Sequence, residues 1–272
     1  MGLGPIRLLE SGDLAAKFEG LGWAAEVDEV DPVDEDLAEV ARVVELDRRL
    51  AGRVRAAVTD GAFPLVVAGN CNSCLGTVAG VGNEGLGVVW LDAHADFDTP
   101  EDNLSGFFDV MGLAIPIGSG WRALRETIPG FSPIDEGDVV VAAVRDLVPY
   151  QRARLEASRV RAVGGPAAGG WEAAFASALD ELRGRVGRVY LHVDLDALDP
   201  GEGTANEHAA PGGLTLERLV GALDAVFSRF AVGAAAVTAY DPACDPDGRM
   251  AGSAATVIET VAGRALAQRR PP

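Results

Sequence analysis

Residues 88–96 read VVWLDAHAD, an apolar run that ends in three potential metal ligands spaced two apart. Side chains alternate along an extended strand, so Asp92, His94 and Asp96 are expected to lie on roughly one side. Short apolar runs of this kind recur along the chain and alternate with stretches rich in Ala, Leu and Arg. Strands that alternate with crossover helices predict a mostly parallel sheet that is covered on both faces.

Eight segments are strand candidates, and helices are expected between them. The strand candidates are Ile6–Leu9, Trp23–Val27, Pro64–Ala68, Gly87–Leu91, Val139–Val144, Val160–Val163, Val189–Val193 and Ala234–Thr238. Helices are predicted over Glu35–Ala56, Trp171–Gly184 and Thr215–Phe230, the last with Thr215 as its N-cap. The sequence has no repeat, low-complexity tract or linker, so residues 1–272 are predicted to form a single α/β domain.

The composition argues against several classes of partner. With 23 basic and 41 acidic residues the formal net charge is −18, which disfavours nucleic acid and anionic membrane surfaces and suits a small cationic substrate. The apolar runs are too short to span a bilayer, and residues 1–10 lack the apolar core of a signal peptide. The three cysteines (Cys71, Cys74 and Cys244) do not form a disulfide framework and indicate a reducing cytoplasm.

A second strand candidate also ends in acidic residues, in the stretch VYLHVDLDALDP at 189–200. Asp194 and Asp196 are expected on one face of it, with His192 below them. Carboxylates gathered at strand ends repel one another unless cations balance their charge. Carboxylates and an imidazole suit ions such as Mn²⁺, and the two strand ends carry enough ligands for two ions. The sequence therefore predicts two divalent ions, with Mn²⁺ as the expected metal.

Two loops are longer than a structural connection needs, and each follows one of the acidic strand ends. They run from Phe97 to about Gly120 and from Gly201 to Gly213. Ligands of open α/β sheets bind at the carboxyl ends of the strands, where such loops gather. The loops are therefore expected to border a substrate site; the alternative is that they are mobile surface loops.

The motifs WLDAHAD and HVDLDALDP together resemble the paired signatures of the arginase/agmatinase (ureohydrolase) superfamily, in their usual order and at roughly their usual separation. Further stretches resemble other segments of the family: VVAGNCNSCLGTVAG (66–80), DTPEDNLSG (98–106), AVRDLVPYQ (143–151) and PGGLT (211–215). The resemblance covers most of the chain. It implies a three-layer α/β/α sandwich with an eight-stranded, mostly parallel sheet.

The resemblance also implies roles for individual residues. Asp92 and Asp194 would bridge the two metal ions. His94 and Asp196 would bind one ion, and Asp96 would bind the other. A hydroxide held between the ions would attack the sp² carbon of a guanidine-like group, because the ions lower the pKa of water. The implied activity is that of a binuclear manganese hydrolase that cleaves a C–N bond.

The sequence departs from the family where the first metal ion is bound. The family carries a histidine ligand there, and the aligned residue is Cys71. A thiolate could replace the imidazole, because a metal strongly lowers the pKa of a thiol. The alternative is a buried free cysteine beside a weakened or empty first site. Cys74 is expected to pack against the sheet, and His192 is expected to support the ligands from beneath.

The proton-shuttling histidine of the family is also absent, and Asp109 stands at the aligned position. A carboxyl group can transfer that proton if burial or neighbouring carboxylates raise its pKa. His208, in the second long loop, is the competing candidate; otherwise it is a solvated loop residue. Asp109 and His208 are therefore the predicted catalytic residues.

The predicted substrate contacts differ from those of arginases. Asp98 stands where arginases hold the α-carboxylate of arginine with an asparagine, and it would repel that group. Val148 and Ala239 replace acidic residues that arginases use to bind substrate. The predicted substrate-binding residues are Asp98, Ser105, Gln151 and Asp241. The expected substrate is a modified guanidino or amidino compound or a related small amide, and not L-arginine itself.

Two functional hypotheses follow. The first is a ureohydrolase-type enzyme, with the Nω-hydroxy-L-arginine hydrolases of antibiotic pathways as candidate relatives. The second is a non-catalytic or single-metal protein of the same fold that acts as a binding or scaffold protein. In either case we expect a monomer or a small homo-oligomer.

Overall fold

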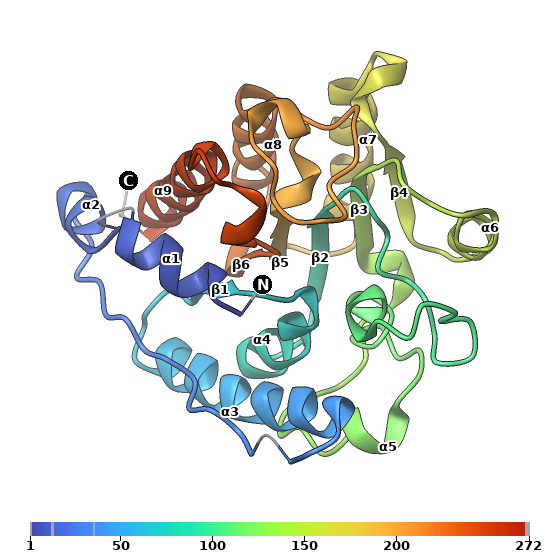
Figure 1. Cartoon of the computed structure of the whole chain (residues 1–272), viewed down its shortest axis with the longest axis horizontal. Coiled ribbons are helices and arrows are strands. Elements are labelled where there is room, and N and C mark those ends of the chain that lie inside the picture. The colour runs from blue at the N-terminus through green and yellow to red at the C-terminus, as the bar shows by residue number, and fades with distance from the viewer. Residues whose placement is uncertain (1, 12–13, 35, 270–272) are drawn as a thin grey trace.

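The structure, a computed structural model, describes residues 2–11, 14–34 and 36–269. Within this part of the chain six parallel strands form one sheet, in the spatial order β1-β6-β5-β2-β3-β4 (Figure 1). The strands are β1 (Leu65–Ala68), β2 (Leu86–Leu91), β3 (Val139–Val144), β4 (Arg161–Gly164), β5 (Arg188–Asp194) and β6 (Ala231–Thr238).

The prediction of eight strands is wrong, because two of the candidates do not join the sheet. Ile6–Leu9 lies within helix α1 (Gly4–Ser11). Pro5 suits the first turn of a helix, where its missing N–H has no partner to lose, and Leu8 anchors one face of the helix in the core. Trp23–Val27 forms no helix or strand. Short apolar runs such as these are compatible with a helix or a strand, and their tertiary packing determines which one forms.

Helices cover both faces of the sheet, as Figure 1 shows. One face carries α1, α2 (Leu14–Leu21), α7 (Trp171–Arg183), α8 (Leu216–Phe227) and α9 (Arg249–Arg269). The other face and the β4 edge carry α3 (Glu39–Thr59), α4 (Cys74–Val81), α5 (Arg122–Arg125) and α6 (Pro149–Ala157). None of the described helices is both long and apolar enough to cross a membrane.

The predicted helices are present, with shifted ends. The Thr215 hydroxyl accepts a hydrogen bond from the Arg218 N–H at 3.3 Å, so Thr215 is the N-cap of α8 as predicted. The predicted start of the α3 helix, Glu35, lies outside the described residues, and α3 itself begins at Glu39.

Strand β2 is buried on both sides and separates two hydrophobic cores. Val89 and Leu91 pack toward α7, α8 and α9, whereas Val88 and Trp90 pack toward α4. This division follows from the two-residue period of a strand. Because both faces of a parallel sheet are covered, its central strands β2 and β3 are continuously apolar, and acidic side chains appear after β2 ends.

The connections of β2 and β5 run in opposite directions across the sheet. From β2 the chain proceeds to β3 on one side, and from β5 it proceeds to β6 on the other. The two strands are neighbours, with Leu91 paired to Val193. Ligand sites of open α/β sheets lie at such switch points, beyond the carboxyl ends of the strands. Both acidic motifs end at this point.

Candidate metal centre

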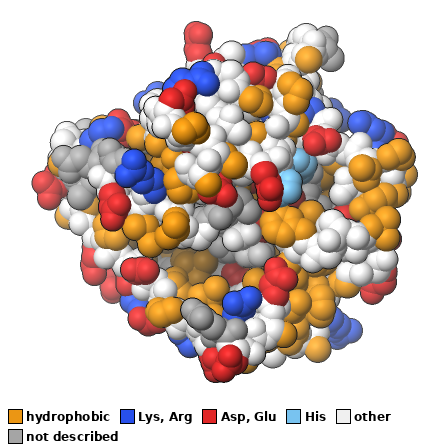
Figure 2. Space-filling view, viewed as in Figure 1, with side chains coloured by type: hydrophobic (Ala, Val, Ile, Leu, Met, Phe, Trp, Pro, Cys, Tyr) orange, Lys and Arg blue, Asp and Glu red, His pale blue; other side chains and the backbone are white. Residues whose placement is uncertain are grey.

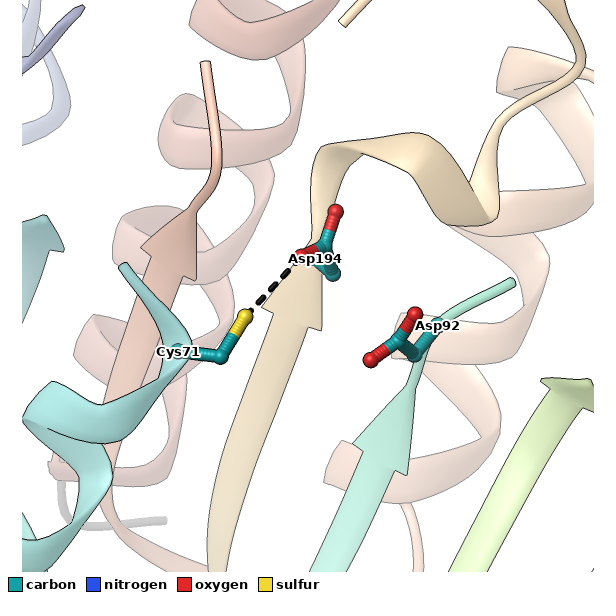
Figure 3. Close-up of side chains that lie close together, drawn as sticks. All are labelled: Cys71, Asp92 and Asp194. Carbon is teal, nitrogen blue, oxygen red and sulfur yellow. Dashed lines mark hydrogen bonds between the residues drawn. The ribbon is translucent and has the colours of Figure 1, made fainter. Parts of the chain in front are cut away.

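Two groups of three side chains meet beyond the ends of β2 and β5, and they share Asp92. We call Cys71, Asp92 and Asp194 the inner triad (Figure 3) and Asp92, His94 and Asp196 the outer triad. In each triad one ligand atom per residue lies within 4.8 Å of the other two. The structure thus brings together all the predicted ligands except Asp96.

The inner triad is buried. Cys71 begins a 3₁₀ turn that follows β1, and Figure 3 shows its sulfur directed toward Asp194, with Asp92 on the far side. The Cys71 Sγ donates a hydrogen bond to Asp194 Oδ2 at 2.9 Å. Burial raises the pKa of Cys71 and of Asp194 well above their usual values, and the neighbouring carboxylates raise both further.

The outer triad centres on His94, whose side chain is 27% exposed. Its Nδ1 lies 3.3 Å from Asp92 Oδ1 and 3.3 Å from Asp196 Oδ2. Burial lowers the pKa of His94, but the hydrogen bonds and charges of Asp196 and Asp92 have the larger combined effect and raise it to about 12. Burial would likewise raise the pKa of Asp196, yet His94 lowers it to about 2. The imidazole therefore occupies a place that favours positive charge.

Asp96 lies beside Cys71 although it belongs to neither triad. A Cβ built on Gly112 would stand 3.1 Å from Asp96 Oδ2 and 3.2 Å from the Cβ of Cys71, so both side chains pack against this glycine. Asp96 has a φ of 47°, in the left-handed region that residues other than glycine rarely adopt. Burial and then the charge of Asp92 raise its pKa well above the usual value. Such strain commonly marks a functional site.

The electrostatics of the cluster fit divalent cations. Among the described residues, His94 is the one basic side chain that forms ion pairs with Asp92 and Asp196. Arg145 lies nearby but donates to backbone carbonyls, including that of Asp196 at 2.7 Å. Buried carboxylates without compensating charge are costly. Oxygen, nitrogen and sulfur donors suit borderline ions, so these residues fit two divalent ions.

A cavity of about 220 Å³ opens over the outer triad. Figure 2 shows histidine side chains next to acidic ones on this face of the molecule. Predicted site residues that line the cavity are His94, Asp96, Asp98, Ser105, Asp109, Gln151, Asp194, Asp196 and His208. Cys71, Asp92 and His192 do not line it. Asp241 does not line it either; its carboxylate accepts a hydrogen bond from the Ala243 N–H at 3.0 Å.

Asp109 is held by three N–H donors at the rim of the inner triad. It accepts hydrogen bonds from the backbone N–H groups of Cys71 at 3.1 Å and Asn72 at 2.8 Å, and from Asn70 Nδ2 at 3.2 Å. Burial raises the pKa of Asp109 to about 6, although these hydrogen bonds act in the opposite direction. A carboxyl group in this state can hold a proton near neutral pH.

Asp98 is 1% exposed and lies where the first long loop meets α6. Its Oδ2 accepts hydrogen bonds from the Tyr150 hydroxyl at 2.9 Å and from Gln151 Nε2 at 3.1 Å. Its Oδ1 has no hydrogen-bond partner among the described residues. The predicted contacts Asp98 and Gln151 are therefore hydrogen-bonded to each other, and the Asp98 carboxylate lies at this end of the cavity.

The sequence analysis missed Asn206, which lines the cavity from the second long loop. Its Nδ2 donates to Asp196 Oδ2 at 3.3 Å and to the Ala239 carbonyl at 3.0 Å. Its Oδ1 accepts from the His208 N–H at 2.8 Å, which orients the loop that carries this histidine. The available signal was an asparagine two residues before His208.

His192, the residue expected to support the ligands, lies beneath the cluster. It is fully buried, and its ring stacks on Trp90 with centroids 3.5 Å apart. Burial lowers the pKa of His192 to about 3, so the imidazole is neutral. Trp90 also donates its indole N–H to Asp92 Oδ2 at 2.8 Å. One tryptophan thus orients both the supporting histidine and the carboxylate that the triads share.

Comparisons with known proteins agree with this architecture. A model of the arginase family matches residues 3–263. The chain is 31% identical to the arginase of Bacillus caldovelox over 238 residues, which cover 86% of this chain and 79% of that protein. A crystal structure of arginase from Bacillus subtilis has a TM-score of 0.86 at 25% identity and covers 96% of this chain and 92% of that chain. A crystal structure of a hypothetical agmatinase from Burkholderia thailandensis has a TM-score of 0.63 at 17% identity, covers 86% of this chain and 69% of that chain, and supports the fold alone.

Proposed function

The chain belongs to the arginase family, and from that premise we propose that it hydrolyses a C–N bond of a small guanidino or amidino compound other than L-arginine. As a ureohydrolase of this family it is a metal-dependent hydrolase that acts on C–N bonds. The observation that supports the proposed substrate site is the pair of triads that share Asp92 beside an acidic cavity.

We assign each triad to one divalent ion, with Mn²⁺ as the expected metal. Cys71, Asp92 and Asp194 would hold the inner ion together with Asp96, which packs beside Cys71. The outer triad would hold the other ion through Asp92, His94 and Asp196. When bound, the ions supply the nucleophile by lowering the pKa of water.

Asp109 is the residue that we assign to proton transfer. Its three N–H partners hold it in one orientation, and it lines the cavity next to the inner triad. Its protonated carboxyl group would give a proton to the departing nitrogen. His208 is the second candidate, because it lines the same cavity with its ring 6.5 Å from that of His94.

The cavity favours a cationic substrate without a carboxylate. None of the described residues that line it is Arg or Lys, whereas the carboxyl groups of Asp96, Asp98 and Asp109 all line it. The α-carboxylate of L-arginine would find no Arg or Lys side chain there, and Asp98 would repel it. An amidine or guanidine whose other end is neutral or cationic avoids this repulsion.

The test is a matched panel of compounds offered to the Mn²⁺-loaded protein. L-arginine, its decarboxylated counterpart agmatine and Nω-hydroxy-L-arginine differ in the carboxylate and in the leaving group, and the release of urea or hydroxyurea and of amine measures turnover. We expect compounds without the carboxylate to be favoured over L-arginine. A kcat/KM for L-arginine of about 10⁴ M⁻¹s⁻¹ or more would refute the proposed specificity.

The metal content tests the rest of the proposal. We expect close to two Mn²⁺ ions per chain by elemental analysis after dialysis. One ion per chain would indicate the single-metal alternative. Two ions without turnover of any guanidino or amidino compound would indicate the binding or scaffold protein.

A further inference from the structure

A chain of buried hydrogen bonds reaches the inner triad from beneath the sheet end. Its members are Tyr190, His192, Thr238 and Cys71, and each is at most 1% exposed. The Tyr190 hydroxyl lies 2.8 Å from His192 Nδ1, and His192 Nε2 lies 3.1 Å from Thr238 Oγ1. Thr238 Oγ1 in turn lies 3.1 Å from the Cys71 sulfur. Because solvent does not reach these groups, each of their polar hydrogens must bond to an acceptor within the protein.

The hydroxyl proton of Tyr190 determines which group donates and which accepts in each of these hydrogen bonds. Among the described residues its acceptor is His192 Nδ1, so this nitrogen carries the lone pair of the neutral imidazole. The proton of the imidazole is then on Nε2, which donates to Thr238 Oγ1. The reverse direction would leave the buried tyrosine proton without an acceptor, which is unfavourable.

The Thr238 hydroxyl, which accepts from His192, must donate its own proton elsewhere. Two acceptors are near: the Cys71 sulfur at 3.1 Å and the Val193 carbonyl oxygen at 3.5 Å. Hydroxyl-to-carbonyl hydrogen bonds normally span about 2.5–3.0 Å, so the carbonyl is a poor acceptor at this distance. Sulfur is larger than oxygen, and 3.1 Å to it is a close contact. The proton therefore points to Cys71.

We propose that Thr238 donates a hydrogen bond to the Cys71 sulfur that stabilises it as a metal ligand, and that Tyr190 and His192 are the positioning residues that set the direction of this bond. The inference rests on the proposed binding of the inner ion by Cys71. When an ion binds, the thiol releases its proton to solvent, and the hydrogen bond from Thr238 remains on the sulfur. The stacking of Trp90 on His192 fixes the ring that sets this direction, and Trp90 also holds Asp92.

The experiment is a titration of the metal-free protein with Co²⁺, which reports a sulfur ligand through its thiolate-to-metal charge-transfer absorption. Thr238→Val removes the donor with little change of shape, whereas Thr238→Ser keeps the hydroxyl. We expect Thr238→Val to move the band to lower energy, because the sulfur lone pair loses a stabilising donor. Its Co²⁺ affinity should fall by about 10–100-fold, the usual effect of losing a partner of a metal ligand. Thr238→Ser should restore both.

Tyr190→Phe provides a test that leaves Thr238 in place. It removes the proton that sets the direction of the chain, so we expect a smaller shift of the same sign. Two matched controls should leave the band unmoved. Tyr240→Phe removes a buried hydroxyl that donates to Asp245, and Thr77→Val removes one that donates to the Ser73 carbonyl.

Two results would distinguish a failure of the proposed Cys71 ligand from a failure of the proposed Thr238 hydrogen bond. A wild-type spectrum without a charge-transfer band that depends on Cys71 would refute the proposed ligand itself. If the band is present but stays at the wild-type energy in Thr238→Val, the chain does not act on the sulfur and this inference is overturned, while the proposed metal centre stands. Should Thr238→Val fail to fold, an unmoved band in Tyr190→Phe has the same consequence.

Discussion

The inner and outer triads share Asp92 but differ in their surroundings. The inner triad is wholly buried, and its cysteine is in contact with Asp194 and Thr238. In the outer triad the His94 side chain is 27% exposed and lines the cavity. The fold therefore fixes the inner site, while solvent and substrate can reach the outer one. A change at the shared Asp92 should remove two ions, and a change at Cys71 of the inner triad should remove one. A change at Asp109, which lines the cavity but belongs to neither triad, should remove none.

The largest effect is expected from Asp92→Asn, because both triads lose a charged ligand. We expect it to remove both ions and all measurable turnover, as shown by elemental analysis and the release of urea or amine. Asp146→Asn is the matched control. Its carboxylate lies 3.7 Å from His94 Nε2, is 61% exposed and belongs to neither triad. Two tightly bound ions in Asp92→Asn would show that the triads do not share this residue.

Cys71→Ser should separate the two sites. We expect it to lose the inner ion, keep the outer ion and lose most turnover, because a serine hydroxyl is a poor substitute for a thiolate. Cys74→Ser is the control, since the Cys74 sulfur is also fully buried but donates to the Gly112 carbonyl at 3.0 Å. With its thiolate the wild-type inner site should accept Zn²⁺ or Co²⁺ more readily than Cys71→Ser does. Equal metal content in the two variants would contradict the assignment of Cys71.

Asp109→Asn should lower turnover without removing an ion. The amide oxygen can accept from the Cys71 N–H or from the Asn72 N–H, which bond to different oxygens of Asp109, and the group can no longer give up a proton at neutral pH. Loss of a general acid typically costs about 10²–10⁴-fold in rate. His208→Asn tests the competing assignment under the same assay. A larger loss in His208→Asn than in Asp109→Asn would exchange their roles.

The acidic strand ends could be predicted from sequence because each one is a contrast between neighbouring residues, an apolar strand followed directly by carboxylates. A buried parallel strand is mostly apolar, so the carboxylates that follow β2 and end β5 stand out. Strand candidates near the N-terminus failed for the opposite reason. Ile6–Leu9 is a short, mostly apolar run interrupted by Arg7, and its helical state depends on packing against the rest of the chain.

Contacts that join distant segments were not visible in the sequence. Asn206 approaches Asp196 because the second long loop folds back over the end of β5. Thr238 meets His192 because β6 pairs with β5, with Asp194 opposite Thr238. Neither residue belongs to a motif with an obvious chemical role. The acidic strand ends could therefore be predicted, whereas the residues that orient their side chains required the topology of the sheet.

The smallest effect is expected at Gly112, which tests how tightly the inner site is packed. Its backbone is helical, with φ −51° and ψ −46°, so alanine suits the conformation itself. An added Cβ, however, would stand 3.1 Å from Asp96 Oδ2 and 3.2 Å from the Cβ of Cys71. These neighbours would have to move by a few tenths of an ångström, and overpacking of this kind costs about 1–3 kcal/mol.

Gly112→Ala should therefore lower the free energy of unfolding by about 1–3 kcal/mol, as measured by denaturant titration of the metal-free protein. It should also weaken the inner ion more than the outer one, because the displaced side chains belong to the inner side. Gly252→Ala is the control: it lies in α9, and its added Cβ would meet no atom within 4 Å. There the higher helix propensity of alanine should raise stability by about 0.5–1 kcal/mol. If Gly112→Ala instead kept wild-type stability and bound both ions as before, close packing of Asp96 and Cys71 would not be what distinguishes the inner site from the outer one.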